Sequence, residues 1–133
     1  MISVDRAGRT SLHYAALEND VAEIMALLAA GVDVDAPDGR GFTPLHLACQ
    51  QWAVDAGRAL LVGGALVDSV NDFGNTPLFV AVFNSRGRGE LIRMLRDRGA
   101  DVLHANKAGQ TPVELARLIG NFDVAQYFTD VPE

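Results

Sequence analysis

Residues 43–48 of the chain read TPLHLA, and three related tetrapeptides occur elsewhere in it. TSLH, TPLF and TPVE begin at Thr10, Thr76 and Thr111, so the four threonines lie 33, 33 and 35 residues apart. Glycines repeat with the same period, at Gly31, Gly64 and Gly99, which lie 33 and 35 residues apart. A fixed period of this length indicates that one small structural unit is repeated and stacked along the chain.

Each unit carries the signals of two short helices. In the second unit, residues 38–41 (DGRG) are typical of a turn. Thr43 then offers an N-cap hydroxyl, and Pro44 takes the first helical position, where its missing N–H costs nothing. A second helix is predicted over residues 54–62, and Gly64 supplies the left-handed conformation that ends it. Helices of only about two turns are marginal alone, so the stacking of units must supply the core.

Apolar residues at helical spacing predict the second helix in the other units as well. These residues are Val21, Ile24, Leu27 and Leu28 in the first unit, Leu91, Ile92 and Leu95 in the third, and Phe122, Val124, Ala125 and Phe128 in the fourth.

The period and the TPLHLA sequence resemble the ankyrin repeat, whose T-P-L-H-x-A signature matches residues 43–48 in every defined position. The resemblance covers almost the whole chain. It implies an all-α, ankyrin-repeat solenoid of four stacked helix-turn-helix units, with β-turn fingers projecting near residues 36–42, 69–75 and 104–110. We therefore expect one domain over residues 1–133, with repeats at about 5–37, 38–70, 71–105 and 106–130.

The resemblance also implies structural roles for the signature positions. Thr10, Thr43, Thr76 and Thr111 are expected to cap the first helices. His13 and His46 are expected to hydrogen-bond to the backbone of the turns, as this histidine does in ankyrin repeats. Phe79 and Glu114 stand in its place in the third and fourth units, and the fourth unit is expected to form the C-terminal cap.

In ankyrin stacks the partner is held by the finger turns and by exposed positions of the first helices, which together form a concave surface. Carried over to this chain, those positions are Arg6, Ala7, Arg9, Gly39, Arg40, Phe42, Gln50, Gln51, Asp72, Phe73, Asn75, Phe83, Asn84, Lys107, Ala108, Gln110 and Leu118. The three phenylalanines are either interface anchors or packing contacts between neighbouring fingers.

Two departures from the repeat pattern have functional alternatives. Trp52, the only tryptophan, is either a partner-binding anchor or a cover for the gap left by Gly57 in the second helix. Two extra residues fall between Thr76 and Gly99, and we place them in residues 84–89, where the glycines predict a mobile loop. Such an insertion is either part of a binding face or neutral.

The formal net charge of −6 argues against wholesale binding to nucleic acid and favours a basic partner, although acidity also serves solubility. Five arginines interrupt this acidity within a 13-residue stretch, at Arg86, Arg88, Arg93, Arg96 and Arg98. They form either a phosphate or acidic-partner site or, because acids are interleaved, a solvated face.

Nothing in the sequence supports catalysis, a cofactor or a metal site. The single cysteine, Cys49, excludes an internal disulfide and is expected to be buried as a small apolar residue. His104 is expected to be exposed in a finger, without ligand partners at metal-binding spacing. No signal peptide or membrane span is evident, so we expect a cytoplasmic monomer that binds neither nucleic acid nor membranes.

The sequence thus favours a non-catalytic protein-protein interaction module that acts as an inhibitor, an immunity-type protein or an adaptor. The alternative is a regulator that binds a small molecule or a phosphate ligand through the arginine-rich loop of the third unit.

Overall fold

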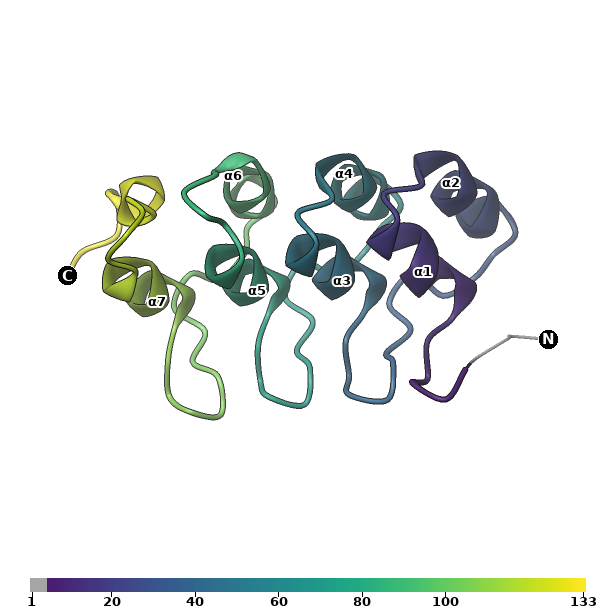
Figure 1. Ribbon diagram of the computed structural model, residues 1–133, viewed down its shortest axis with the longest axis horizontal. Helices are drawn as coiled ribbons and strands as arrows, with labels where there is room; N and C mark the ends of the chain where they lie inside the picture. Colours follow the sequence, from purple (N-terminus) through teal and green to yellow (C-terminus); the bar gives the residue numbers. More distant parts are fainter. Residues whose placement is uncertain (1–4) are drawn as a thin grey trace.

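The computed structural model describes residues 5–133, so residues 1–4 of the predicted domain lie outside the described part. The helices form two rows, from which long turns project on one side (Figure 1). The first row contains α1 (Ser11–Leu17), α3 (Pro44–Gln50), α5 (Pro77–Phe83) and α7 (Pro112–Leu118). The second contains α2 (Val21–Ala29), α4 (Val54–Val62), α6 (Glu90–Asp97) and the 3-10 helix η1 (Ala125–Phe128). Residues 5–133 contain no strand, and the prediction of an all-α solenoid is confirmed.

The helix ends follow the predicted signals. Thr43 Oγ1 accepts a hydrogen bond of 3.3 Å from the backbone N–H of His46, and Pro44 is the first residue of α3. Thr10, Thr76 and Thr111 cap α1, α5 and α7 in the same way. Beyond the second helices, Gly31, Gly64 and Gly99 have φ values of +86°, +96° and +84°. They supply the left-handed conformation that ends a helix at little cost.

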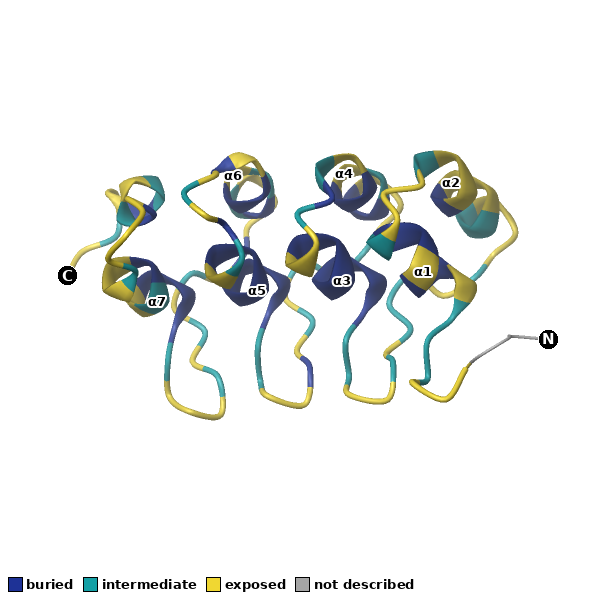
Figure 2. Ribbon diagram, viewed as in Figure 1, coloured by how far each residue is buried: buried dark blue, intermediate teal, exposed yellow. Residues whose placement is uncertain are grey.

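The core lies between the two rows and between neighbouring units, where the buried residues gather (Figure 2). Leu45, Leu60 and Leu78 are fully buried there. Six of the seven residues of α3 are buried, and so are six of the seven of α5, because each of these helices packs between two others of its row. None of the helices in the described chain combines the length and the hydrophobicity needed to cross a membrane.

The prediction of a second α-helix in the fourth unit is wrong. Only a 3-10 turn forms, over Ala125–Phe128, and it has no side-chain N-cap. Val124 and Phe128 are buried as expected, whereas Phe122 is exposed. A helix this short depends on packing for its stability, and in residues 5–133 no further unit covers its outer side.

The insertion lies in residues 84–89, between α5 and α6, where the corresponding α3–α4 connection has only residues 51–53. The expectation that this loop is mobile does not fit its contacts. Tyr127 Oη donates a hydrogen bond of 2.6 Å to the carbonyl oxygen of Gly87. A Cβ atom at Gly89 would collide with the Tyr127 ring. The glycines therefore let the C-terminal unit pack against the loop.

Candidate functional site

One Asp or Asn side chain closes each finger. Asp38 Oδ1 accepts hydrogen bonds from the backbone N–H groups of Arg40, at 2.8 Å, and of Phe42, at 2.9 Å. The same pair of bonds is made in the other fingers by Asp5, Asn71 and Asn106. These residues were not predicted as finger closures, although their separations of 33, 33 and 35 residues repeat the period of the threonines.

Neighbouring fingers are also joined to each other. One backbone hydrogen bond links each pair, from the N–H of Gly39 to Ala7 O at 2.8 Å, of Asp72 to Arg40 O at 2.9 Å, and of Lys107 to Phe73 O at 3.0 Å. Because every described finger takes part, the side chains on the finger row are held at fixed distances from one unit to the next.

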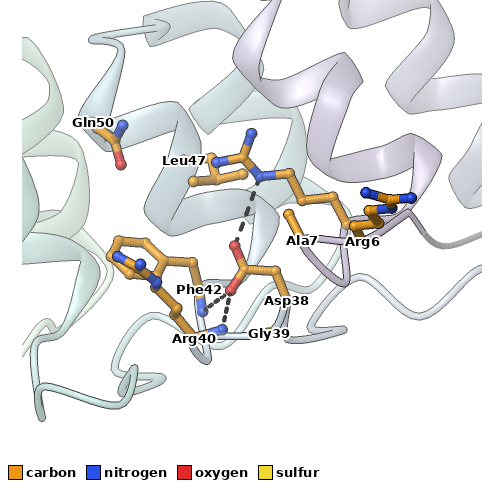
Figure 3. Close-up of a pocket in the computed structure, with 9 residues that line it drawn as sticks. Arg6, Ala7, Asp38, Gly39, Arg40, Phe42, Leu47 and Gln50 are labelled. Carbon is orange, nitrogen blue, oxygen red and sulfur yellow. Dashed lines mark hydrogen bonds and ion pairs between the residues drawn. The ribbon is translucent and has the colours of Figure 1, made fainter.

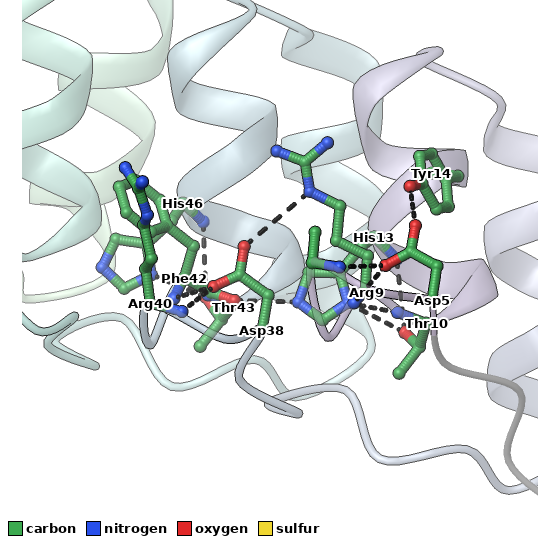
Figure 4. A network of polar contacts seen from close by, with 11 residues as sticks. Asp5, Arg9, Thr10, His13, Tyr14, Asp38, Arg40, Phe42, Thr43 and His46 are labelled. Carbon is green, nitrogen blue, oxygen red and sulfur yellow. Dashed lines mark hydrogen bonds and ion pairs between the residues drawn. The ribbon is translucent and has the colours of Figure 1, made fainter.

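His46 fastens the first helix of one unit to the finger of the next. Its Nδ1 accepts a 3.1 Å hydrogen bond from the backbone N–H of Thr43, so Nε2 carries the proton and donates at 2.8 Å to the carbonyl oxygen of Asn75. His13 makes the same bonds to Thr10 and Phe42 (Figure 4). Burial lowers the pKa of His13 and lowers that of His46 to about 4. The structural role implied for both histidines is confirmed.

The junction between the third and fourth units is built differently, because Phe79 cannot make these bonds. Asn106 Nδ2 donates a 2.8 Å hydrogen bond to Asn75 Oδ1. His104, which we expected to be exposed, is half-buried, and its Nε2–H donates at 3.2 Å to the carbonyl oxygen of Gly74. Glu114 accepts from the N–H of Thr111 at 3.2 Å and so replaces the histidine within its own helix.

Three hollows follow one another along the face made by the fingers and the first-row helices. The first, of 560 Å³, lies between the first and second units (Figure 3) and is lined by Arg6, Ala7, Arg9, Asp38, Gly39, Arg40, Phe42, Leu47 and Gln50. The second, of 440 Å³, is lined by Phe42, Gln50, Phe73, Asn75, Phe79, Val80, Phe83 and Asn84. The third, of 550 Å³, is lined by Asp72, Phe73, Asn75, Phe79, Phe83, Asn106, Lys107, Ala108, Gln110 and Leu115.

Shared residues join the hollows into one surface, which we call the finger groove. Phe42 and Gln50 line the first and second hollows, and four residues, Phe73, Asn75, Phe79 and Phe83, line the second and third. Fifteen of the seventeen positions carried over from ankyrin stacks lie in this groove: Arg6, Ala7, Arg9, Gly39, Arg40, Phe42, Gln50, Asp72, Phe73, Asn75, Phe83, Asn84, Lys107, Ala108 and Gln110. Gln51 and Leu118 lie outside it, and so does Trp52.

The phenylalanines of the finger groove differ in exposure. Phe42 is half-buried, and its ring meets that of Phe73 edge to face at a centroid distance of 6.4 Å. Phe79 forms a buried floor. Phe73 and Phe83 remain 52% and 70% exposed. Packing between neighbouring fingers therefore accounts for Phe42, whereas Phe83 presents an apolar surface that the described chain leaves uncovered.

The charge of the finger groove is opposite in sign to that of the chain. Four basic side chains and two acidic ones line it: Arg6, Arg9, Arg40 and Lys107 against Asp38 and Asp72. Asp38 is already engaged, because its Oδ1 accepts two finger hydrogen bonds and its Oδ2 lies 3.8 Å from Arg9 Nε. The groove is thus basic on a chain whose formal net charge is −6.

Trp52 contacts the insertion loop rather than the groove. Its Nε1 donates a 3.1 Å hydrogen bond to Glu90 Oε2, and the Arg88 guanidinium lies 4.7 Å from the centre of its ring. Trp52 does not fill the space at Gly57, since a Cβ atom there would lie 2.9 Å from Leu91 Cδ2. The interpretation of Trp52 as a cover for that glycine is therefore wrong, because a leucine of the next unit occupies the space.

The arginine-rich stretch does not form an open anion site. Arg88 lies on Trp52, Arg93 lies 4.9 Å from the centre of the Tyr127 ring, and Arg98 donates to Leu61 O at 3.1 Å. Arg96 holds the Asp130 carboxylate with two hydrogen bonds of 2.8 and 2.7 Å. Within residues 5–133, Arg86 and Arg93 make no side-chain hydrogen bond or ion pair, and Arg93 is covered by its contact with the Tyr127 ring. The structure therefore brings no group of free arginines together in this stretch.

Cys49 is buried, as predicted, and burial raises the pKa of its thiol. A buried thiol of this kind is a poor nucleophile. In the part of the chain that the structure describes, no three His, Cys, Asp or Glu residues gather closely enough to hold a metal ion.

Comparison with known families agrees with this geometry. Residues 12–56 match a family model described as "Ankyrin repeats (many copies)", and residues 73–107 match one described as "Ankyrin repeat". The two matches together span more than half of the chain. No curated protein matches it.

Proposed function

This chain belongs to the ankyrin repeat family, whose repeats generally mediate protein–protein interactions, and we propose that it is a non-catalytic module that holds a partner protein in the finger groove. The observation that carries the proposal is the continuity of the three hollows, which share Phe42 and Gln50 on one side and Phe73 and Phe83 on the other.

The groove has the features of a preorganised binding surface. Hydrogen bonds join neighbouring fingers, and His13 and His46 tie two of the fingers to helices. A partner would therefore meet side chains that lose little further freedom on binding. Exposed aromatic side chains such as Phe73 and Phe83 are the usual anchors of protein interfaces.

We propose further that the chain acts by covering a surface of its partner, as an inhibitor, an adaptor or an immunity-type protein does. The side chains best suited to acid–base or nucleophilic chemistry are engaged elsewhere. Both ring nitrogens of His13 and of His46 are hydrogen-bonded within the fold, and Cys49 is buried.

The test is affinity capture of the partner on the full chain, with variants matched for lost apolar surface. Phe73→Ala with Phe83→Ala removes the exposed anchors of the groove. Met25→Ala with Leu66→Ala removes apolar side chains of similar exposure, 63% each, outside it. The proposal expects the groove variant to lose the partner and the control to retain it. Equal capture by both variants would place the binding surface elsewhere.

A further inference from the structure

We infer that the segment held in the finger groove carries an apolar side chain and, within one unit of the stack, an acidic side chain. This inference rests on the proposed function and specifies the chemistry of the partner. It follows from two neighbouring parts of the groove that differ in character, the first hollow with its three arginines and the second hollow with its phenylalanines.

The first hollow is suited to a carboxylate. The side chains of Arg6 and Arg40 are exposed and form no hydrogen bond or ion pair with any side chain of residues 5–133. Arg9 lies beside them, and its buried Nε atom forms an ion pair with Asp38 Oδ2 at 3.8 Å but has no hydrogen-bond partner within the described chain. Asp38, the one carboxylate among the described residues that line this hollow, already accepts bonds from its own finger (Figure 3). Guanidinium groups bind carboxylates through charge-assisted, often bidentate hydrogen bonds.

The second hollow is suited to an apolar side chain. Its floor is Phe79 and Val80, which are buried, and the exposed rings of Phe73 and Phe83 line it as well. The amides that line it, from Gln50, Asn75 and Asn84, carry no net charge. The described lining of this hollow contains no charged side chain that would favour a charged group of the partner over an apolar one.

The two hollows meet at Phe42 and Gln50, which line both. Helices that pack as neighbours have axes about 8–10 Å apart, and an extended chain advances about 3.3 Å per residue. Side chains alternate between two faces in a β-strand but return to the same side every three residues in a polyproline II segment, which advances about 3.1 Å per residue. An acidic and an apolar side chain three residues apart in a polyproline II segment would therefore reach one hollow each.

Two other observations bear on the acidic side chain. In the third hollow Asp72 faces the groove together with Lys107, so that end has no net preference for either charge. The net charge of −6 of the whole chain repels a uniformly acidic protein. The acidic residue we infer is therefore local to the bound segment, and the basic partner favoured by net charge alone does not match the groove itself.

The experiment is selection from a random displayed peptide library on the immobilised full chain. The affinities of the selected peptides are then measured against three variants. Arg6→Glu with Arg40→Glu reverses the free charges of the first hollow. Phe73→Ala with Phe83→Ala empties the second. Arg86→Glu repeats a charge reversal at an exposed arginine outside the groove.

We expect selected peptides to pair Leu, Phe, Ile or Met with Asp or Glu about three residues away. Their affinity should fall about tenfold or more in the arginine double variant, fall in the phenylalanine variant, and stay within about twofold in Arg86→Glu. Peptides that need Phe73 and Phe83 but carry no acidic residue, or tolerate the reversed arginines, would overturn this inference and leave the proposed function intact. Peptides indifferent to both double variants would contradict the proposed function as well.

Discussion

The Nε2–H group of His46 donates a 2.8 Å hydrogen bond to the carbonyl oxygen of Asn75, which lies 29 residues later in the chain. The bond joins the first helix of the second unit to the finger of the third. Asn75 itself lines the finger groove. The position of one wall of the groove therefore depends on a side chain that is fully buried.

Replacing this histidine should destabilise the stack. In His46→Leu the N–H of Thr43 and the carbonyl of Asn75 lose their partners in a buried site, and we expect the free energy of unfolding to fall by about 3 kcal/mol. His104→Leu is the matched control, because its bond to Gly74 is longer, at 3.2 Å, and half-buried. It should cost less than about 1 kcal/mol. Urea unfolding measures both, and equal costs would contradict the assigned role of His46.

The buried histidines also predict how stability depends on pH. Histidine ordinarily has a pKa of 6.5, and burial lowers that of His46 to about 4. The unfolded chain takes up this proton near pH 6.5 and the folded chain only near pH 4, so stability is complete above the first value and is lost as the pH falls toward the second.

The expected loss from His46 is roughly 3 kcal/mol over that window, and His13 contributes in the same direction. Hydrogen bonds to Tyr14 and Arg96 lower the pKa values of Asp5 and Asp130 from 3.8. Their contribution to the free energy of unfolding is therefore lost only below that pH. Urea unfolding at a series of pH values checks this. A stability that stays constant from pH 6.5 to pH 4 would rule out a buried, neutral His46.

Arg96 is expected to stabilise the C-terminal unit more through its contacts with Tyr127 and Phe128 than through its ion pair with Asp130. It donates at 2.7 Å to the carbonyl oxygen of Tyr127 and lies 5.3 Å from the centre of the Phe128 ring. Asp130→Asn weakens an exposed ion pair and should change the stability only slightly. Arg96→Ala loses all these contacts and should cost about 2 kcal/mol. Hydrogen exchange at the Tyr127 amide should accelerate clearly more in Arg96→Ala, and similar exchange in both variants would count against this arrangement.

Gly57 should resist a substitution that normally stabilises helices. Alanine is favoured over glycine in a helix by about 1 kcal/mol, yet the new methyl group would lie 2.9 Å from Leu91 Cδ2 in the core. We expect Gly57→Ala to lower the melting temperature and Leu91→Val to restore part of the loss in the double variant. Gly120→Ala, with no atom within 4 Å of the new Cβ, is the control and should be neutral or slightly stabilising. A clear gain in stability in Gly57→Ala would show that Leu91 moves aside freely.

Features set by neighbouring residues could be predicted from the sequence. The cap at Thr43 and the left-handed Gly64 follow from local conformational preference, and both are confirmed. The predicted second helix over residues 54–62 coincides with α4 (Val54–Val62). The finger closures by Asp38 and its equivalents were equally local and could have been found from their period.

Features that depend on other units could not be predicted in this way. Leu91 fills the space at Gly57 from the next unit, and Trp52 meets Arg88 only because the insertion brings that residue across. The fourth unit forms a 3-10 turn in place of an α-helix, because its stability is decided by packing on one side alone. The basic character of the groove on an acidic chain depends on the fold, because the fingers bring Arg6, Arg9 and Arg40 around one hollow.

The most direct test of the finger groove as the binding surface is site-specific photo-crosslinking to the captured partner. A photo-reactive phenylalanine analogue placed at Phe73 or at Phe83 would report on the groove, and the same analogue at Met25 or at Leu66 on other exposed apolar positions. We predict crosslinks to the partner from the two groove positions and none from the other two. Crosslinks from position 25 or 66, with none from 73 or 83, would contradict the account.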